Sequence, residues 1–167
     1  MKKGYTLYLT RGALIAALYV ALTYLSSLFG LSSGAIQFRI SEALCILPIF
    51  LPEAVIGLAV GCLVANIATA AVFWDIVFGT IATLIGAFGA YLLRKLPEKL
   101  IFIATIPTVL SNAIIIPVVL IYAYGAPDAY PYLMLTVAIG EIVCAFLGGT
   151  LLYHSLKKTN LPLFKRI

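Results

Sequence analysis

Residues 9–29 have the sequence LTRGALIAALYVALTYLSSLF. After Arg11 this stretch carries no charge, and it has about the 20 residues that a helix needs to cross the hydrocarbon core of a bilayer. Comparable apolar stretches follow at 40–51, which is short, and at 54–73, 75–94, 102–124 and 132–156. The sequence therefore predicts an all-α integral membrane protein, with residues 1–167 forming one compact bundle of six transmembrane helices.

The overall composition supports this fold class. Hydrophobic residues make up 63% of the 167 residues and charged residues 10%, and the mean hydropathy is +1.14. A soluble domain of this length cannot hide so much apolar surface, because much of its surface faces water. We expect no removable signal peptide, since the first apolar stretch is a full span without a small-residue cleavage site.

The basic residues predict the orientation of the bundle. Ten of the eleven Lys and Arg residues stand at three places that fall on one side of the membrane if six helices cross it. They are Lys2, Lys3 and Arg11, then Arg94, Lys95 and Lys99, then Lys157, Lys158, Lys165 and Arg166. The positive-inside rule places both chain termini in the cytoplasm and leaves only Arg39 outside. Cations at the ends of spans also argue against a nucleic-acid-binding surface.

Several polar side chains interrupt or flank the apolar stretches, and these are the candidate site residues. An ionisable group at membrane depth is costly unless it is paired or solvated, so each such group is a functional hypothesis. In the predicted topology, five helices direct these groups toward one outward-opening cavity that suits a polar small molecule. The candidates are Gln37, Arg39, Glu42, Asn66, Asp75, Asn112 and Glu141.

Simpler structural roles stay open for most of these residues. Arg39 and Glu42 stand three apart, so on one helical face they can neutralise each other. Asp75 can cap the helix that it begins, and the two asparagines can form hydrogen bonds between helices. Glu141 is the strongest candidate, because it is predicted near mid-membrane with no cation nearby in sequence.

A stripe of small residues marks the first predicted helix. Ala13, Ala17 and Ala21 are spaced four apart, which allows another helix to approach closely. That helix belongs either to the same chain or to another subunit, and the sequence leaves both possibilities open.

Motifs that carry enzymatic chemistry are missing from the sequence. Cys45, Cys62 and Cys144 each stand alone in an apolar run, with spacing that matches neither a zinc site nor a redox pair. No nucleophile and base stand in a recognisable arrangement. We therefore predict no catalytic residues, no metal and no cofactor.

The most specific motif is Gln37-Phe38-Arg39-Ile40-Ser41-Glu42-Ala43-Leu44. Further motifs follow it in order at 79–84 (GTIATL), 111–113 (SNA) and 137–141 (VAIGE). Together they resemble the queuosine-precursor transporter family (QueT), one of the substrate-binding S-components of energy-coupling factor (ECF) transporters. The resemblance extends over most of the chain and implies a six-helix S-component in a bacterial plasma membrane.

The resemblance also implies a ligand and partners. The ligand would be a 7-deazaguanine such as preQ1, preQ0 or queuine. The partners would be a membrane coupling subunit, docked on the face that the alanine stripe resembles, and two cytoplasmic ATPases. The chain has no G-x-x-x-x-G-K-[ST] phosphate loop, so we do not expect it to be an enzyme, and its energy would come from those partners.

The chemistry of a deazaguanine suggests roles for the candidates. Its adjacent N–H donors suit carboxylate acceptors, for which Glu141 and Glu42 are the first choices. Asn112, Asn66 and Gln37 would contact the ring, and Arg39 would hold Glu42 in place. Asp75 would meet a cationic group or order the outer loops, and Trp74 would stack on the base or anchor the protein at the interface.

Other functions remain open at this stage. One is an S-component for another vitamin-like solute, and a second is a small proton-coupled carrier in which Glu141 and Asp75 relay protons. A membrane enzyme is a third class, disfavoured by the missing motifs. The glycine-containing segment 30–37, next to the candidate site, is predicted to act as a lid.

Overall fold

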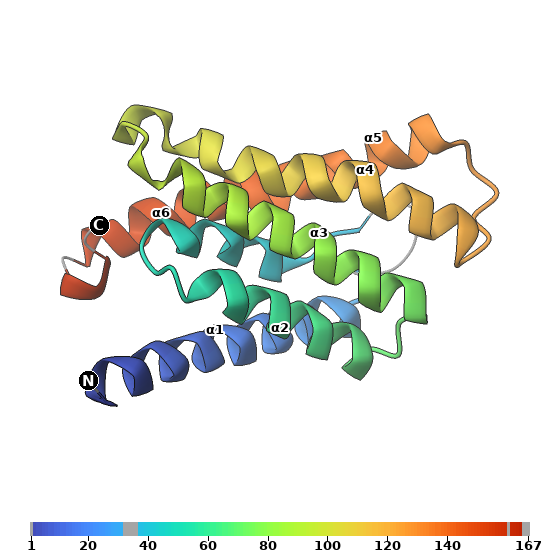
Figure 1. Cartoon of the computed structure of the whole chain (residues 1–167). Coiled ribbons are helices and arrows are strands. Elements are labelled where there is room, and N and C mark those ends of the chain that lie inside the picture. Colours follow the sequence, from blue (N-terminus) through green and yellow to red (C-terminus); the bar gives the residue numbers. More distant parts are fainter. Residues whose placement is uncertain (1, 32–36, 160, 165–167) are drawn as a thin grey trace.

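Figure 1 shows the computed structural model, which describes residues 2–31, 37–159 and 161–164 as a helical bundle without strands. Its α-helices are α1 (Lys2–Leu28), α2 (Ala54–Ala68), α3 (Phe73–Leu92), α4 (Ile106–Tyr122), α5 (Tyr130–Glu141) and α6 (Gly149–Lys158). The 3₁₀ helices are η1 (Ile40–Ile49), η2 (Leu93–Lys95), η3 (Glu98–Thr105) and η5 (Pro162–Phe164), and η4 (Ile142–Gly148) is π-helical. The predicted lid falls largely on residues 32–36, outside the described residues.

Four continuous stretches of helix are long and apolar enough to cross a membrane. They are Gly4–Leu28, Phe73–Lys95, Glu98–Tyr122 and Tyr130–Lys158. The other two predicted spans correspond to the shorter apolar helices η1 and α2. The all-helical membrane fold class is therefore confirmed, although α2 ends at Ala68 rather than at residue 73.

Helices that follow one another along the chain pack as neighbours, and η1 lies among them. Contacts join α1 to α2, α2 to α3, α3 to α4 and α4 to α5, while η1 contacts α1, α2, α3, α6 and η4. The start of α1 and the end of α6 lie at the same end of the bundle (Figure 1). The turns at 69–72 and 123–129 lie at the opposite end (Figure 1).

Glycines bring α1 and α2 into backbone contact. A Cβ atom added to Gly57 would lie 2.6 Å from the carbonyl oxygen of Gly12, and one added to Gly61 would lie 2.8 Å from Cβ of Tyr19. Membrane helices associate closely through such small residues, because lipid provides little hydrophobic drive between them. The face of α1 that carries Gly12 and Tyr19 is therefore fixed against α2.

The alanine stripe lies on a different face of the same helix. Ala13, Ala17 and Ala21 are all exposed in the described structure, whereas Ile15 and Tyr19 are buried. The sequence left open whether the alanine stripe packs against a helix of the same chain or of another subunit. Within the chain, α1 packs against α2 through its glycine-bearing face and not through the alanine stripe.

Two irregular helices meet inside the bundle. The 3₁₀ helix η1 contains Pro48, and the π-helical η4 begins directly after Glu141. The two segments pack against each other. Long 3₁₀ and π-helical stretches are uncommon and often accompany functional sites, so the residues beside this contact are candidates for a functional site.

Candidate functional site

A cluster of buried polar side chains lies in the otherwise apolar bundle. It draws on α1, η1, α2, α3, α4 and α5, and its buried members are Tyr19, Glu42, Asn66, Asp75, Asn112 and Glu141. The Arg39 side chain, 13% exposed, lies at its edge. Buried polar and charged groups are costly without partners, so the contacts of each member indicate its role.

Arg39 and Asp75 are the centre of one half of the cluster. Arg39 Nη2 lies 3.7 Å from Asp75 Oδ2, and Arg39 Nη1 donates to Asn66 Oδ1 at 3.5 Å. The Tyr124 hydroxyl donates to Asp75 Oδ2 at 2.9 Å. This network connects the segment before η1 to α2, α3 and the loop after α4.

A tight turn brings Asn66 and Asp75 together. Ala70 has φ of 55°, in the left-handed region that is unfavourable for a residue with a Cβ atom. The turn lets Asn66 Nδ2 donate to the backbone carbonyl of Asp75 at 3.2 Å, so Asn66 forms the interhelical hydrogen bond that the sequence suggested. The N-cap of α3 is Val72, and Asp75 makes no capping hydrogen bond there. Its carboxylate faces Arg39 instead.

Glu42 has partners other than the one expected. The Tyr19 hydroxyl donates to Glu42 Oε1, and the Cys45 thiol donates to Glu42 Oε2 at 3.3 Å. The expectation that Arg39 holds Glu42 through an i, i+3 contact is not what the structure shows. Arg39 precedes η1 with extended backbone angles of φ −100° and ψ 100°, so the helical spacing rule does not apply to it.

Glu141 is a buried acid with an oxygen that lacks a hydrogen-bond partner, as is Asp75, whose Oδ1 atom also has none among the described residues. Glu141 ends α5, is 8% exposed, and has the Asn112 side chain within hydrogen-bonding reach. Its Oε2 atom has no hydrogen-bond partner among the described residues. Glu42 and Arg39 are both near enough to interact with it electrostatically. A second carboxylate and an unpaired oxygen inside an apolar bundle create a demand for a hydrogen-bond donor or a cation.

Gln37 lies beside the cluster, whereas Trp74 lies outside it. The backbone carbonyl oxygen of Gln37 packs against Gly140 of α5, so closely that a Cβ atom added to Gly140 would overlap this oxygen. Gln37 therefore lies beside the residue that precedes Glu141. Trp74 is 54% exposed and stacks on Phe78, at a distance of 5.9 Å between ring centroids. This position matches the interfacial-anchor alternative for Trp74 and does not bring the indole into the cluster.

Two tyrosines and the cysteines were not among the candidates. Tyr19 and Tyr124 supply hydroxyl donors to Glu42 and Asp75. Asn66 Nδ2 lies 3.7 Å from the Cys62 sulfur, and Cys144 lies near Glu141. The three thiols thus border the cluster as small polar packing groups. Among the described residues, no set of three or more His, Cys, Asp or Glu side chains is arranged to hold a metal ion.

Asp75→Asn is expected to destabilise the protein. The substitution removes the charge opposite a guanidinium that is largely buried, and loss of one partner from such a pair costs about 2 kcal/mol or more. Thermal unfolding in detergent should show a melting temperature lower by about 5 °C. The control is Glu98→Gln, which breaks an ion pair with Lys157 that is half exposed on both sides and should have little effect. Equal melting of the two variants would contradict the structural role of the Arg39–Asp75 pair.

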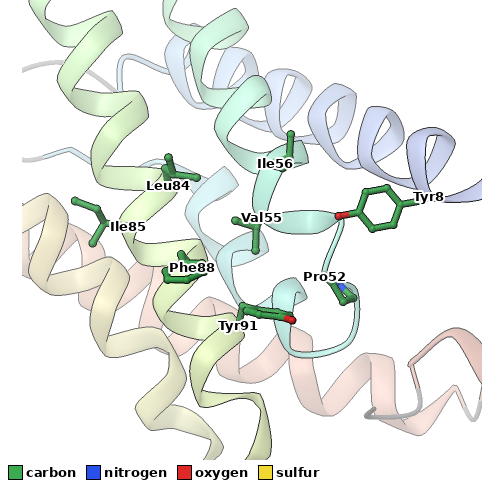
Figure 2. A pocket seen from close by; sticks show the side chains of 8 residues that line it. All are labelled: Tyr8, Pro52, Val55, Ile56, Leu84, Ile85, Phe88 and Tyr91. Atoms are coloured by element: carbon green, nitrogen blue, oxygen red, sulfur yellow. The ribbon is translucent and has the colours of Figure 1, made fainter. Parts of the chain in front are cut away.

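An apolar groove lies elsewhere on the bundle surface. It has a volume of about 530 Å³ between α1, the start of α2 and α3. Figure 2 shows its lining, which includes Pro52, Val55, Leu84 and Phe88 with the rings of Tyr8 and Tyr91. None of the candidate polar residues lines this groove. A polar ligand would find few hydrogen-bonding groups there, so the buried cluster is the better candidate site.

The cluster carries hydrogen-bonding groups that suit a polar molecule with several donors. It offers carboxylate acceptors in Glu42 and Glu141 and amide groups in Asn66 and Asn112, held by separate helices. Such groups give hydrogen-bonding specificity, and the apolar surroundings strengthen each contact.

Comparison with known proteins agrees with the motifs in the sequence. The model of the QueT transporter family matches residues 9–158. A curated relative, the queuosine precursor transporter QueT of Lactococcus lactis subsp. cremoris (strain MG1363), is 37% identical over 86 residues. That alignment covers 51% of this chain and 50% of the relative, so the chain spans about half the length of the curated relative that it matches. No solved structure matches the chain. The chain therefore belongs to the QueT transporter family and is a multi-pass membrane protein.

Proposed function

We propose that this chain is the substrate-binding membrane subunit, or S-component, of an ECF-type importer of a queuosine precursor. The substrate would be a 7-deazaguanine such as preQ1, preQ0 or queuine. Membership of the QueT transporter family supports the transport role. The observation that carries the proposal is Glu141, a buried carboxylate whose Oε2 atom has no partner among the described residues.

The balance of charge in the cluster supports a cationic ligand. Among the described residues of the cluster, Glu42, Asp75 and Glu141 supply three carboxyl groups, while Arg39 is the one cation, and it pairs with Asp75. A deazaguanine edge would donate to one of the two remaining carboxylates, and the aminomethyl cation of preQ1 would neutralise the other. PreQ0 carries a nitrile in place of the aminomethyl group and would leave one carboxylate without a cation.

The proposal includes partners and topology. A coupling subunit would dock on the exposed stripe of Ala13, Ala17 and Ala21, and two cytoplasmic ATPases would supply the energy. All six helical segments would cross or enter the membrane with both termini in the cytoplasm. The placement of Arg94 and Lys157 at segment ends, and of Arg11 in the first half of α1, supports this orientation through the positive-inside rule.

A second candidate is a proton-coupled carrier for another vitamin-like solute. The proximity of Glu42 and Glu141 favours it, because two neighbouring buried acids can share and release a proton. Uptake by the chain alone, driven by a pH gradient and independent of ATP, would support this function over the first.

Direct binding to the purified protein tests the proposed ligand. Isothermal titration in detergent with preQ1, queuine, preQ0, guanine and an unrelated vitamin should give tight binding of preQ1. PreQ0 should bind at least about tenfold more weakly, because one buried carboxylate would stay unpaired. The unrelated vitamin is the negative control. A folded protein that binds no deazaguanine would refute the proposed substrate, and one that binds the vitamin would support the second candidate.

A further inference from the structure

Three hydroxyl groups on α1 contact three successive residues of η1. The Tyr19 hydroxyl donates to Glu42 Oε1, and Thr23 Oγ1 donates to Ser41 Oγ at 2.7 Å. Ser26 Oγ accepts from the backbone N–H of Ile40 at 3.1 Å. The α1 positions are spaced i, i+4 and i+7, so they lie on one face of the helix. We refer to Tyr19, Thr23 and Ser26 as the hydroxyl row.

The hydroxyl row is buried along its whole length. The exposed fractions of Tyr19, Thr23 and Ser26 are 0%, 2% and 0%. Hydrogen bonds in such surroundings are strong, and removing one partner leaves the other desolvated and unsatisfied. Ile40, Ser41 and Glu42 belong to the QFRISEAL motif at 37–44, so the row holds the most specific part of the sequence.

Tyr19 is also fixed from its other side. Its Cβ atom lies against Gly61 of α2, where any larger residue would collide with it. The same helix presents Ala13, Ala17 and Ala21 on an exposed face. A rotation or tilt of α1 would therefore move the hydroxyl row and, through Tyr19, the Glu42 carboxylate.

We propose that Tyr19 is a positioning residue, and that the hydroxyl row makes ligand affinity depend on the placement of α1 by orienting Glu42. The ligand itself rests on the proposed function. The consequence is a direct physical connection between the exposed face of α1 and the binding site. A partner that displaces α1 would loosen the hold on Glu42 and so favour release of the ligand.

Tyr19→Phe tests this role, with a matched control in the same chain. The variant keeps the ring and removes the hydroxyl, so preQ1 should bind about fivefold more weakly. Tyr153→Phe is the control, because Tyr153 is fully buried and its hydroxyl has no partner among the described residues. In a Glu42→Gln background, Tyr19→Phe should change affinity by less than about twofold, since the residue acts through Glu42. An equal loss in both backgrounds would indicate a general packing role and overturn the inference.

A measurement without ligand separates this inference from the proposed function. Cys45 also donates to Glu42, so release of Glu42 should expose its thiol. In a protein with Cys62→Ser and Cys144→Ala, alkylation of Cys45 by N-ethylmaleimide should be faster after Tyr19→Phe and unchanged after Tyr153→Phe. If the parent binds no deazaguanine but Cys45 responds in this way, the proposed substrate fails and the positioning role stands. Equal alkylation in both tyrosine variants would reject the positioning role.

Discussion

Glu141→Gln is expected to weaken preQ1 binding by about ten- to one-hundredfold. The substitution preserves the size of the side chain but replaces an acceptor carboxylate by an amide, and it removes a charge-assisted hydrogen bond of about 1.5–3 kcal/mol. Glu141 is the residue for this test because its Oε2 atom is buried without a partner among the described residues, and because the other acid with such an oxygen, Asp75, is paired with Arg39. The loss should be of similar size for preQ0, which presents the same ring N–H donors. Titration calorimetry in detergent measures both affinities.

The control for Glu141→Gln is a second buried glutamate far from the cluster. Glu53 precedes α2 and lies 3.4 Å from Arg11, at the end of the bundle where α1 begins. Glu53→Gln should bind preQ1 within about twofold of the parent, since its carboxylate faces Arg11 and not the cluster. If the Glu141→Gln variant binds preQ1 with the affinity of the parent, Glu141 is not a ligand contact and the central part of the proposal is wrong. Equal losses in both variants would point to a general effect on folding.

The membrane fold was predictable because apolar length and charge placement are local properties of the sequence. The predicted span at 9–29 corresponds to α1, and the span at 75–94 corresponds to α3 with η2. The end of α2 was not predictable in the same way. Thr69 and Ala70 continue an apolar run with no proline or glycine, and only the structure shows the left-handed turn at Ala70. Likewise, η3 has the composition of an ordinary helix, so its 3₁₀ form left no signal.

The membership of the cluster was more predictable than its pairing. Each of Asn66, Asp75, Asn112 and Glu141 is costly inside a membrane, and that cost alone predicts that such groups gather away from lipid. Partner choice depends on backbone geometry instead. Arg39 was assigned to Glu42 by helical spacing, but its extended backbone directs the guanidinium to Asp75.

The tyrosines were missed because each has an ordinary explanation in a membrane protein. Tyr124 is the last residue of the predicted span 102–124, and aromatic residues are common at such interfacial positions. Tyr19 stands among leucines and valines and is easily taken for a packing residue. A usable signal was nevertheless present, since Tyr19, Thr23 and Ser26 place three hydroxyl groups on one helical face.

Ala17→Trp is expected to abolish uptake by the assembled transporter while leaving ligand binding intact. Ala17 is exposed at the centre of the alanine stripe, and a bulky indole there would keep a docking helix from close approach. Its side chain does not face the cluster, so the purified variant should bind preQ1 within about twofold of the parent. Uptake in cells that express the chain with a coupling subunit and ATPases, beside titration of the purified subunit, measures both properties.

The position of the indole, rather than its presence, should decide the outcome of this experiment. Ile114→Trp places the same group on an exposed side of α4, where Ile114 is 54% exposed, and should leave uptake near the parental level. If the Ala17→Trp protein also supports normal uptake, the alanine stripe is not the docking face, and the proposed contact with the coupling subunit is wrong. If Ala17→Trp abolishes both uptake and preQ1 binding and Ile114→Trp affects neither, the displacement of α1 has altered the position of Glu42. The stripe and the hydroxyl row occupy different faces of one helix, so this result would connect docking to binding.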